Sequence, residues 1–104
     1  MSEYEIDHCP ETKDFFDSLD DKSKKIFRDH FKELASAPHT WDGHRDKEKL
    51  AVSGIELYRM QVSRTWTIFY TILEEKKQVR LVEILTIDEA HEKYGYWFLN
   101  NWRN

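Results

Sequence analysis

The chain has 104 residues, of which 39% are hydrophobic, 35% charged and 14% aromatic, and its formal net charge at pH 7 is −4. This length fits one domain with a single hydrophobic core, and the composition excludes a disordered tail or a repeat array. The acidic balance excludes a protein that binds nucleic acid along a wide basic face. Only residues 55–80 contain more basic than acidic side chains, so we expect phosphate contacts to be confined to that region.

The sequence also indicates a cellular compartment. No segment is apolar over the length that a membrane helix needs, and the N-terminus lacks the basic and apolar regions of a signal peptide. The single cysteine, Cys9, has no partner for an internal disulfide, which fits a reducing compartment. We therefore expect a cytoplasmic protein with no membrane partner.

The N-terminal half predicts a strand and two helices. Residues 4–6 alternate as a short strand does. Pro10 suits the first turn of a helix ending near Ser18, because its missing N–H would have no partner there. Asp20 or Asp21 then caps a second helix, which residues 37–38 end.

The second of these helices has one apolar stripe. Its apolar side chains recur at three- and four-residue spacing: Phe27, Phe31, Leu34 and Ala35. The stripe predicts that the two helices form an antiparallel hairpin and cover one face of a sheet.

Residues 39–54 have no sustained period and hold two of the three glycines, so they are predicted to form a long loop. His39, Asp42 and His44 match no zinc-ligand spacing, and we expect neither a metal nor another cofactor. The basic side chains of the loop could reach RNA, or could form a solvated face with the acids between them: Arg45, Lys47 and Lys49.

Three antiparallel strands are predicted next, over residues 57–62, 66–73 and 79–85. In the first of them Arg59 and Gln61 alternate with apolar residues and share one face. A basic side chain there could contact phosphate, whereas the alternative is a cross-strand ion pair between Arg59 and Glu83.

The C-terminal part is expected to hold a short helix around His91. If so, His91 and Tyr94 lie on one side of a helical turn, where they could transfer protons or be a surface histidine beside a packed tyrosine. An aromatic tail from about residue 95 could stack on bases or pack on the protein or a partner: Tyr96, Trp97, Phe98 and Trp102. Residues 1–104 are predicted to form one domain.

The predicted fold is α+β, a helical hairpin packed on a small antiparallel sheet in the order β-α-α-β-β-β with a short C-terminal helix. This order and the sequence LYRMQVSRTWTIFY resemble the RelE/ParE superfamily of toxins from type II toxin–antitoxin pairs, nearer the RelE-like branch. The matching motifs are Tyr58–Val62, Trp66–Tyr70, Leu19-Asp20, Pro38 and Tyr94. The resemblance covers about residues 2–95.

The resemblance implies a metal-independent endoribonuclease that cuts messenger RNA on the ribosome and is bound by a cognate antitoxin. In this family the ribose 2′-hydroxyl attacks the adjacent phosphate, helped by cations and proton-transfer groups. Arg59, His91 and Tyr94 are the implied catalytic residues. The implied RNA-binding residues are Arg64, Gln61, Arg45, Lys47 and Lys49.

The sequence departs from the family at several basic positions. Gln61 and Thr67 stand where many members have a basic residue, and the segment after the last strand lacks the usual arginine. This depletion favours an alternative, a non-catalytic binding protein of the same fold. Such a protein would be a ParE-like inhibitor of DNA gyrase or an inactive toxin relic bound by an antitoxin.

Overall fold

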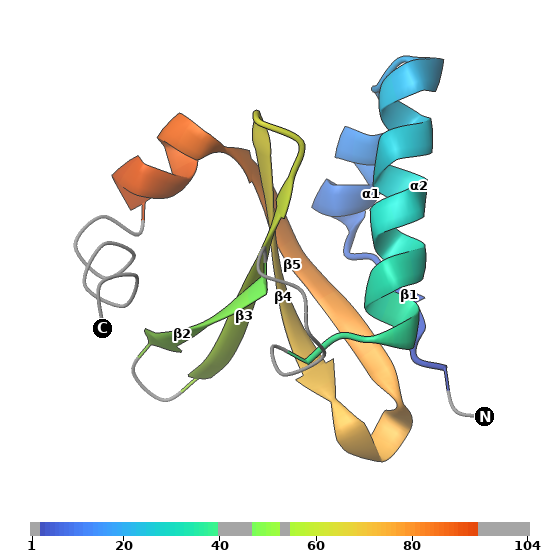
Figure 1. Ribbon diagram of the computed structural model, residues 1–104, viewed down its shortest axis with the longest axis vertical. Helices are drawn as coiled ribbons and strands as arrows, with labels where there is room; N and C mark the ends of the chain where they lie inside the picture. Colours follow the sequence, from blue (N-terminus) through green and yellow to red (C-terminus); the bar gives the residue numbers. More distant parts are fainter. Residues whose placement is uncertain (1–2, 40–46, 53–54, 94–104) are drawn as a thin grey trace.

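The computed structural model describes residues 3–39, 47–52 and 55–93. The elements, in chain order, are β1 (Glu5–Asp7), α1 (Pro10–Asp17), α2 (Asp21–Ser36), β2 (Lys47–Val52), β3 (Ile55–Val62), β4 (Trp66–Leu73), the short 3₁₀ helix η2 (Glu74–Lys76) and β5 (Gln78–Thr86). Residues 87–93 are helical. Figure 1 shows three layers, with α1 and α2 on one side of a twisted sheet and the helix of residues 87–93 on the other.

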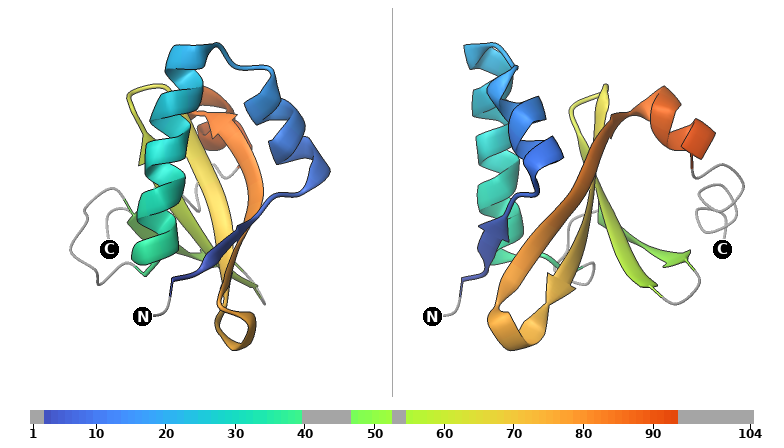
Figure 2. Two further views of the ribbon diagram at one scale, coloured as in Figure 1. Left: turned by 90° about the vertical axis from the view of Figure 1, so that its right-hand side faces the viewer. Right: turned by 180° about the vertical axis from the view of Figure 1, so that it is seen from behind.

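The sheet has five strands in the order β1-β5-β4-β3-β2. This confirms the α+β class and the helical hairpin on a sheet, and the short helix follows β5 as expected. The sheet is mixed rather than wholly antiparallel, because β1 runs parallel to β5. The two views of Figure 2 show β1 beside β5 and under the ends of both helices.

The loop prediction for residues 39–54 was wrong in part, because β2 lies within it. β2 pairs antiparallel with β3 along six residues, from Lys47 opposite Met60 to Val52 opposite Ile55. The sequence KEKLAV does not alternate cleanly, which hid the strand. β2 is at the edge of the sheet, and edge strands tolerate charged residues that blunt pairing with other chains.

Both helices begin where the sequence predicts. Pro10 occupies the first turn of α1, and the side chain of Asp20 accepts a 2.8 Å hydrogen bond from the backbone N–H of Ser23 at the start of α2. α2 ends at Ser36, one residue before Ala37. The Asp20 cap gives a partner to a backbone N–H at the start of α2 that would otherwise lack one.

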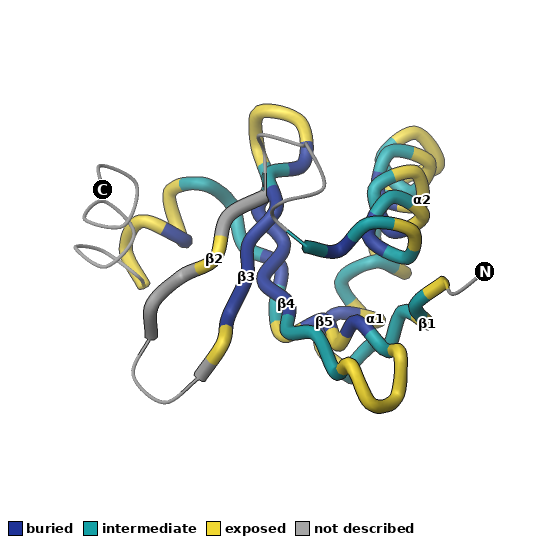
Figure 3. Tube along the Cα trace, turned by 60° about the horizontal axis from the view of Figure 1, so that its bottom comes forward, coloured by how far each residue is buried: buried dark blue, intermediate teal, exposed yellow. Residues whose placement is uncertain are grey.

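The main core lies between the helical hairpin and the sheet. Its aromatic centre joins both helices to β4, since Phe15 contacts Phe27 at 5.6 Å and Trp66 at 4.9 Å between ring centroids. Figure 3 shows that the buried residues concentrate along β3 and β4. Each fully buried side chain of this size contributes about 1.5–3 kcal/mol, so this apolar cluster is the main source of stability.

A bulge keeps β5 in register with this core. Tyr70 lies opposite Leu81 whereas Phe69 lies opposite Glu83, so Val82 is the extra residue. Leu81 and Ile84 therefore both face the main core although they are three residues apart. None of the helices in the described part of the chain is long and apolar enough to cross a membrane.

Candidate functional site

The face of the sheet opposite α1 and α2 carries the side chains that the sequence singles out. We call the part of this face around Arg59 the site face, and its described side chains are Leu57, Arg59, Gln61, Thr67, Phe69, Glu83 and Leu85. The helix of residues 87–93 packs here through Ala90, which joins Leu57, Phe69 and Leu85 in a second small core. The site is therefore covered by an element that follows it directly in sequence.

Arg59 lies at the middle of the site face. Its register neighbours are Glu48 on β2 and Phe69 on β4, and Phe69 is in turn opposite Glu83 on β5. Arg59 is only 4% exposed. A guanidinium stays charged at any physiological pH, so burying it requires compensating interactions. Arg59 therefore lies on the face opposite the main core, as alternation predicts, but its side chain is almost completely buried there.

Glu83 and Lys93 form an ion pair between β5 and the C-terminal helix. The Nζ atom of Lys93 lies 2.9 Å from Oε1 and 2.8 Å from Oε2 of Glu83. The side chain of Glu83 is 22% exposed and that of Lys93 is 56% exposed. Glu83 lies two strands from Arg59 in the register, with Phe69 between them.

This ion pair lines a hollow at the edge of the site face. The hollow has a volume of about 430 Å³ and is lined by Glu83, Leu85, Glu89, Glu92 and Lys93. Glu89 also caps the helix, since its Oε1 accepts a 2.9 Å hydrogen bond from the N–H of Thr86. Three carboxylates and one ammonium make the hollow acidic. It is a poor place for phosphate to bind unless Lys93 turns towards it.

The other predicted residues lie apart from Arg59 or outside the described residues. Gln61 donates from Nε2 to the carbonyl oxygen of Ser63 at 3.1 Å, which places its amide at the β3–β4 turn. Arg64 is exposed in the same turn, and His91 is exposed on the C-terminal helix. Arg45 and Tyr94 lie outside the described residues.

Lys49 is on the opposite face from Arg59. Its register partner is Tyr58, a residue of the main core, and its Nζ lies 6.0 Å from the centre of the Tyr58 ring. A 2.8 Å hydrogen bond to Glu56 raises the pKa of Lys49. Lys47 is two residues away in β2 and takes a register position on the same face. The structure therefore does not bring these two lysines together with Arg59.

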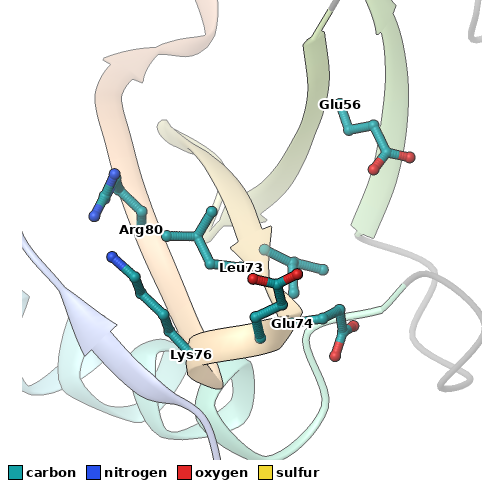
Figure 4. A pocket seen from close by; sticks show the side chains of 7 residues that line it. Glu56, Leu73, Glu74, Lys76 and Arg80 are labelled. Carbon is teal, nitrogen blue, oxygen red and sulfur yellow. The ribbon is translucent and has the colours of Figure 1, made fainter.

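A second hollow, of about 480 Å³, lies at the β4–β5 turn (Figure 4). Figure 4 shows Lys76 and Arg80 on one side of Leu73, and Glu56 and Glu74 on the other. Most of these charges are already paired within the chain. Arg80 pairs with Asp7 at 2.9 Å, and Lys49 pairs with Glu56.

Glu74 belongs to a small polar cluster at the rim of this second hollow. It accepts a 2.7 Å hydrogen bond from the hydroxyl of Tyr4, and its other oxygen lies 2.6 Å from Nε2 of His39. The Tyr4 hydrogen bond is the largest cause of the lowered pKa of Glu74, and the nearby His39 adds to it. This cluster fastens β1 and the end of the helical hairpin to the β4–β5 turn.

No three His, Cys, Asp or Glu side chains gather closely enough to hold a metal ion among the described residues. The structure also identifies two residues that sequence reasoning did not place in a site. Glu83 was considered only as a partner of Arg59, and Lys93 was not considered. The strand VRLVEIL offered a signal, because Glu83 is its one acid and most of its other residues are apolar.

The fold is similar to that of several solved structures. A chain of the archaeal RelE–RelB complex from Pyrococcus horikoshii OT3 superimposes with a TM-score of 0.67 at 18% identity, over 83% of this chain and 96% of that one. A chain of the RelBE2 toxin–antitoxin complex from Mycobacterium tuberculosis gives 0.64 at 15% identity, over 83% and 93%. The isolated RelE toxin from E. coli gives 0.55 at 15% identity, over 86% and 97%.

The similarity is one of structure. No protein-family model matches the sequence, and no curated protein matches it significantly. The chain therefore has the RelE-like fold, at a level of identity that leaves its activity to be argued from its own residues.

Proposed function

We propose that this protein is a RelE-like toxin of a type II toxin–antitoxin pair, which acts in the cytoplasm by cutting messenger RNA on the ribosome. The observation that carries the proposal is the position of Arg59 at the centre of the site face of a RelE-like sheet. The family resemblance assigns a phosphate-binding cation to this position. The cognate antitoxin is proposed as a partner because two of the similar structures are complexes with antitoxins.

The proposed reaction is a metal-independent transesterification. The 2′ oxygen loses its proton and bonds to the adjacent phosphorus, while the bond from phosphorus to the 5′ oxygen breaks. Arg59 would stabilise the charge that develops on the phosphoryl oxygens, and an optimally placed donor of this kind lowers the barrier by about 3 kcal/mol. The exposed His91 would supply the proton for the 5′ oxygen, with Tyr94 and Arg64 assisting.

The deciding experiment is induced expression in a bacterial host, with primer extension on several messages. We expect growth arrest and discrete cuts from the wild type, and neither from Arg59→Ala. Arg59→Lys, which keeps a charge but loses the bidentate geometry, should retain part of the cutting. Arg28→Ala, which removes an exposed arginine from α2, is the control and should behave as wild type. Arrest of wild-type cells with all messages intact would contradict the proposal.

A second candidate function has its own support. Arg59 is almost completely buried, and the adjacent hollow is acidic, which suits contact with a protein better than contact with RNA. A ParE-like inhibitor of DNA gyrase would stop growth with DNA damage and uncut messages. An inactive toxin relic would bind an antitoxin without stopping growth. The same expression experiment separates these outcomes from ribonuclease activity.

A further inference from the structure

The site face has a proton acceptor that neither the sequence motifs nor the family resemblance assigns. Among the residues of β3, β4 and β5 on this face whose side chains are described, Glu83 is the one carboxylate. It stands in the same cross-strand row as Arg59, with Phe69 between them. Neighbouring strands are about 4.8 Å apart, so the backbones of Arg59 and Glu83 are roughly 10 Å apart. Two long side chains can converge across that distance on one phosphodiester.

Glu83 can be reached from solvent, whereas Arg59 is only 4% exposed. The Glu83 side chain is 22% exposed and lines the 430 Å³ hollow between β5 and that helix. The fully buried Phe69 provides a rigid apolar neighbour on the sheet. A nucleotide entering the hollow would therefore meet a carboxylate on a strand, held by a packed sheet and not by a loop.

Lys93 gives this carboxylate a companion cation. Its ammonium lies within 2.9 Å of both oxygens of Glu83 and is itself 56% exposed, so it can turn towards a phosphate without losing contact with the hollow. A carboxylate beside an ammonium provides a base and a positive charge in one place. The transesterification needs a base for the 2′ proton and a positive charge for the phosphate. The pair could supply both in a sequence that lacks several of the family's arginines.

We propose that Glu83 is the general base of the cleavage and that Lys93 binds the scissile phosphate beside it. This inference rests on the proposed ribonuclease function. Glu83 takes the proton of the 2′-hydroxyl as the 2′ oxygen bonds to phosphorus. The 5′ oxygen leaves and takes a proton from His91 or water. The products are a 2′,3′-cyclic phosphate and a 5′-hydroxyl end, and the protonated Glu83 returns its proton to solvent.

The test is single-turnover cleavage of ribosome-bound message by purified protein, measured across pH. For the wild type we expect a rate that falls in acid, because a protonated carboxyl group cannot take the 2′ proton. Glu83→Gln should lower the rate at neutral pH by about 10²–10⁴-fold and remove the fall in acid. Glu83→Asp should restore part of the rate together with the fall in acid, because the carboxylate is present again but shorter.

Lys93→Met separates catalysis from simple fastening of the helix. It breaks the same ion pair but keeps the Glu83 carboxylate. We expect it to weaken substrate binding and to keep the fall of the rate in acid. Asp7→Asn, which breaks the exposed pair between β1 and Arg80 of β5, is the matched control and should leave both the rate and its pH dependence unchanged.

Two results would overturn the inference while the ribonuclease function stands. One is a Glu83→Gln protein that cleaves within threefold of the wild type. The other is an equal loss in Glu83→Gln and Lys93→Met with the same pH profile in both, which would show that the pair only fastens the helix. Absence of cleavage by the wild-type protein would instead refute the proposed function, and the inference would fall with it.

Discussion

At the scale of single residues, Tyr70 shows how the fold combines an apolar core with a buried hydrogen bond. The ring is fully buried and stacks on Tyr58 with ring centroids 5.5 Å apart. Its hydroxyl donates a 2.8 Å hydrogen bond to the carbonyl oxygen of Pro38, which closes the helical hairpin onto β4. A buried hydroxyl is tolerated only with such a partner, so the end of α2 and the middle of the sheet depend on each other.

We predict that Tyr70→Phe lowers the free energy of unfolding by about 1–3 kcal/mol, because it leaves the buried carbonyl of Pro38 without this donor. Urea denaturation followed by tryptophan fluorescence measures the change. Tyr58→Phe is the control, since it keeps the ring stack and should change stability by less than about 0.5 kcal/mol. Equal losses of unfolding free energy in both variants would mean that the Tyr70 hydrogen bond does not stabilise the fold more than the hydroxyl of Tyr58 does.

His8 is a second residue whose surroundings have a measurable consequence. Its ring packs edge-on against Phe31 with centroids 5.1 Å apart, and its Nδ1 is buried with no hydrogen-bond partner among the described residues. Burial lowers the pKa of His8 from 6.5, and the positive charge of Lys13 lowers it further, against the opposing effect of Asp7 and Asp17. The folded protein therefore binds this proton less readily than the unfolded chain does.

We predict that stability falls as the pH drops from about 6.5 through the folded-state pKa of His8, because the unfolded chain takes up the proton first. His8→Phe keeps an aromatic ring on Phe31 but cannot titrate, so it should lose this decline. Denaturation midpoints between pH 7 and 5 test the point. His30→Phe, a change to another half-buried histidine, is the control and should keep the decline. A decline that persists in His8→Phe would assign it to other groups.

At the scale of elements, the C-terminal helix decides whether the site face is accessible. A reciprocal cap holds its start. The Oγ1 of Thr86 accepts a 3.0 Å hydrogen bond from the N–H of Glu89, and a Glu89 carboxylate oxygen accepts one from the N–H of Thr86. The pair of Glu83 and Lys93 fastens its other end. Loosening either end should expose Leu57 and Phe69 of the site face without disturbing the main core.

We predict that Thr86→Ala lowers the stability of this helix by about 1 kcal/mol, which corresponds to roughly fivefold faster amide hydrogen exchange in residues 87–93. Thr86→Ser keeps a hydroxyl acceptor and should restore most of the protection. Exchange in α2 should be unaffected in both variants, because α2 packs on the other face of the sheet. Protection that falls equally in α2 would show that the cap supports the whole fold.

The sequence predicted most of these elements because their signals are local. Pro10, Asp20 and the apolar stripe of α2 specify the hairpin through backbone chemistry and helical period, and β3 and β4 follow from alternation. β2 was missed because an edge strand is specified by pairing with β3 and not by its own residues. The parallel pairing of β1 with β5 joins two strands that are far apart in the sequence. No local sequence pattern encodes such a pairing.

The candidate site was less predictable than the fold for a physical reason. Alternation correctly put Arg59 and Gln61 on the face opposite the main core, but the packing of Ala90 on Leu57 and Phe69 of this face involves a helix more than 25 residues later in the chain. The contact of Lys93 with Glu83 likewise requires the chain to turn after β5. Such contacts follow from tertiary packing, whereas sequence spacing fixes only neighbours within an element.

At the scale of the whole molecule, charge is the main obstacle to binding RNA. The net charge is −4, and the hollow beside the site face is lined by three carboxylates against one ammonium. Of these carboxylates, Glu83 pairs with Lys93 and Glu89 caps the helix. Glu92 is exposed on the last described turn, and within the described part of the chain it forms neither an ion pair nor a helix cap. It is the acid whose removal tests electrostatics with the least structural disturbance.

We predict that Glu92→Lys strengthens binding to programmed ribosomes by on the order of 1 kcal/mol, about fivefold, at low salt, because it reverses a charge beside the proposed phosphate position. Glu11→Lys makes the same change of net charge on α1, on the far side of the sheet, and should have a much smaller effect. The difference between the two variants should shrink at 0.15 M salt, where charges more than about 8 Å apart are screened. Equal gains in both would show that overall charge, and not the hollow, controls the encounter, whereas a gain confined to Glu92→Lys would place the bound RNA at the C-terminal helix.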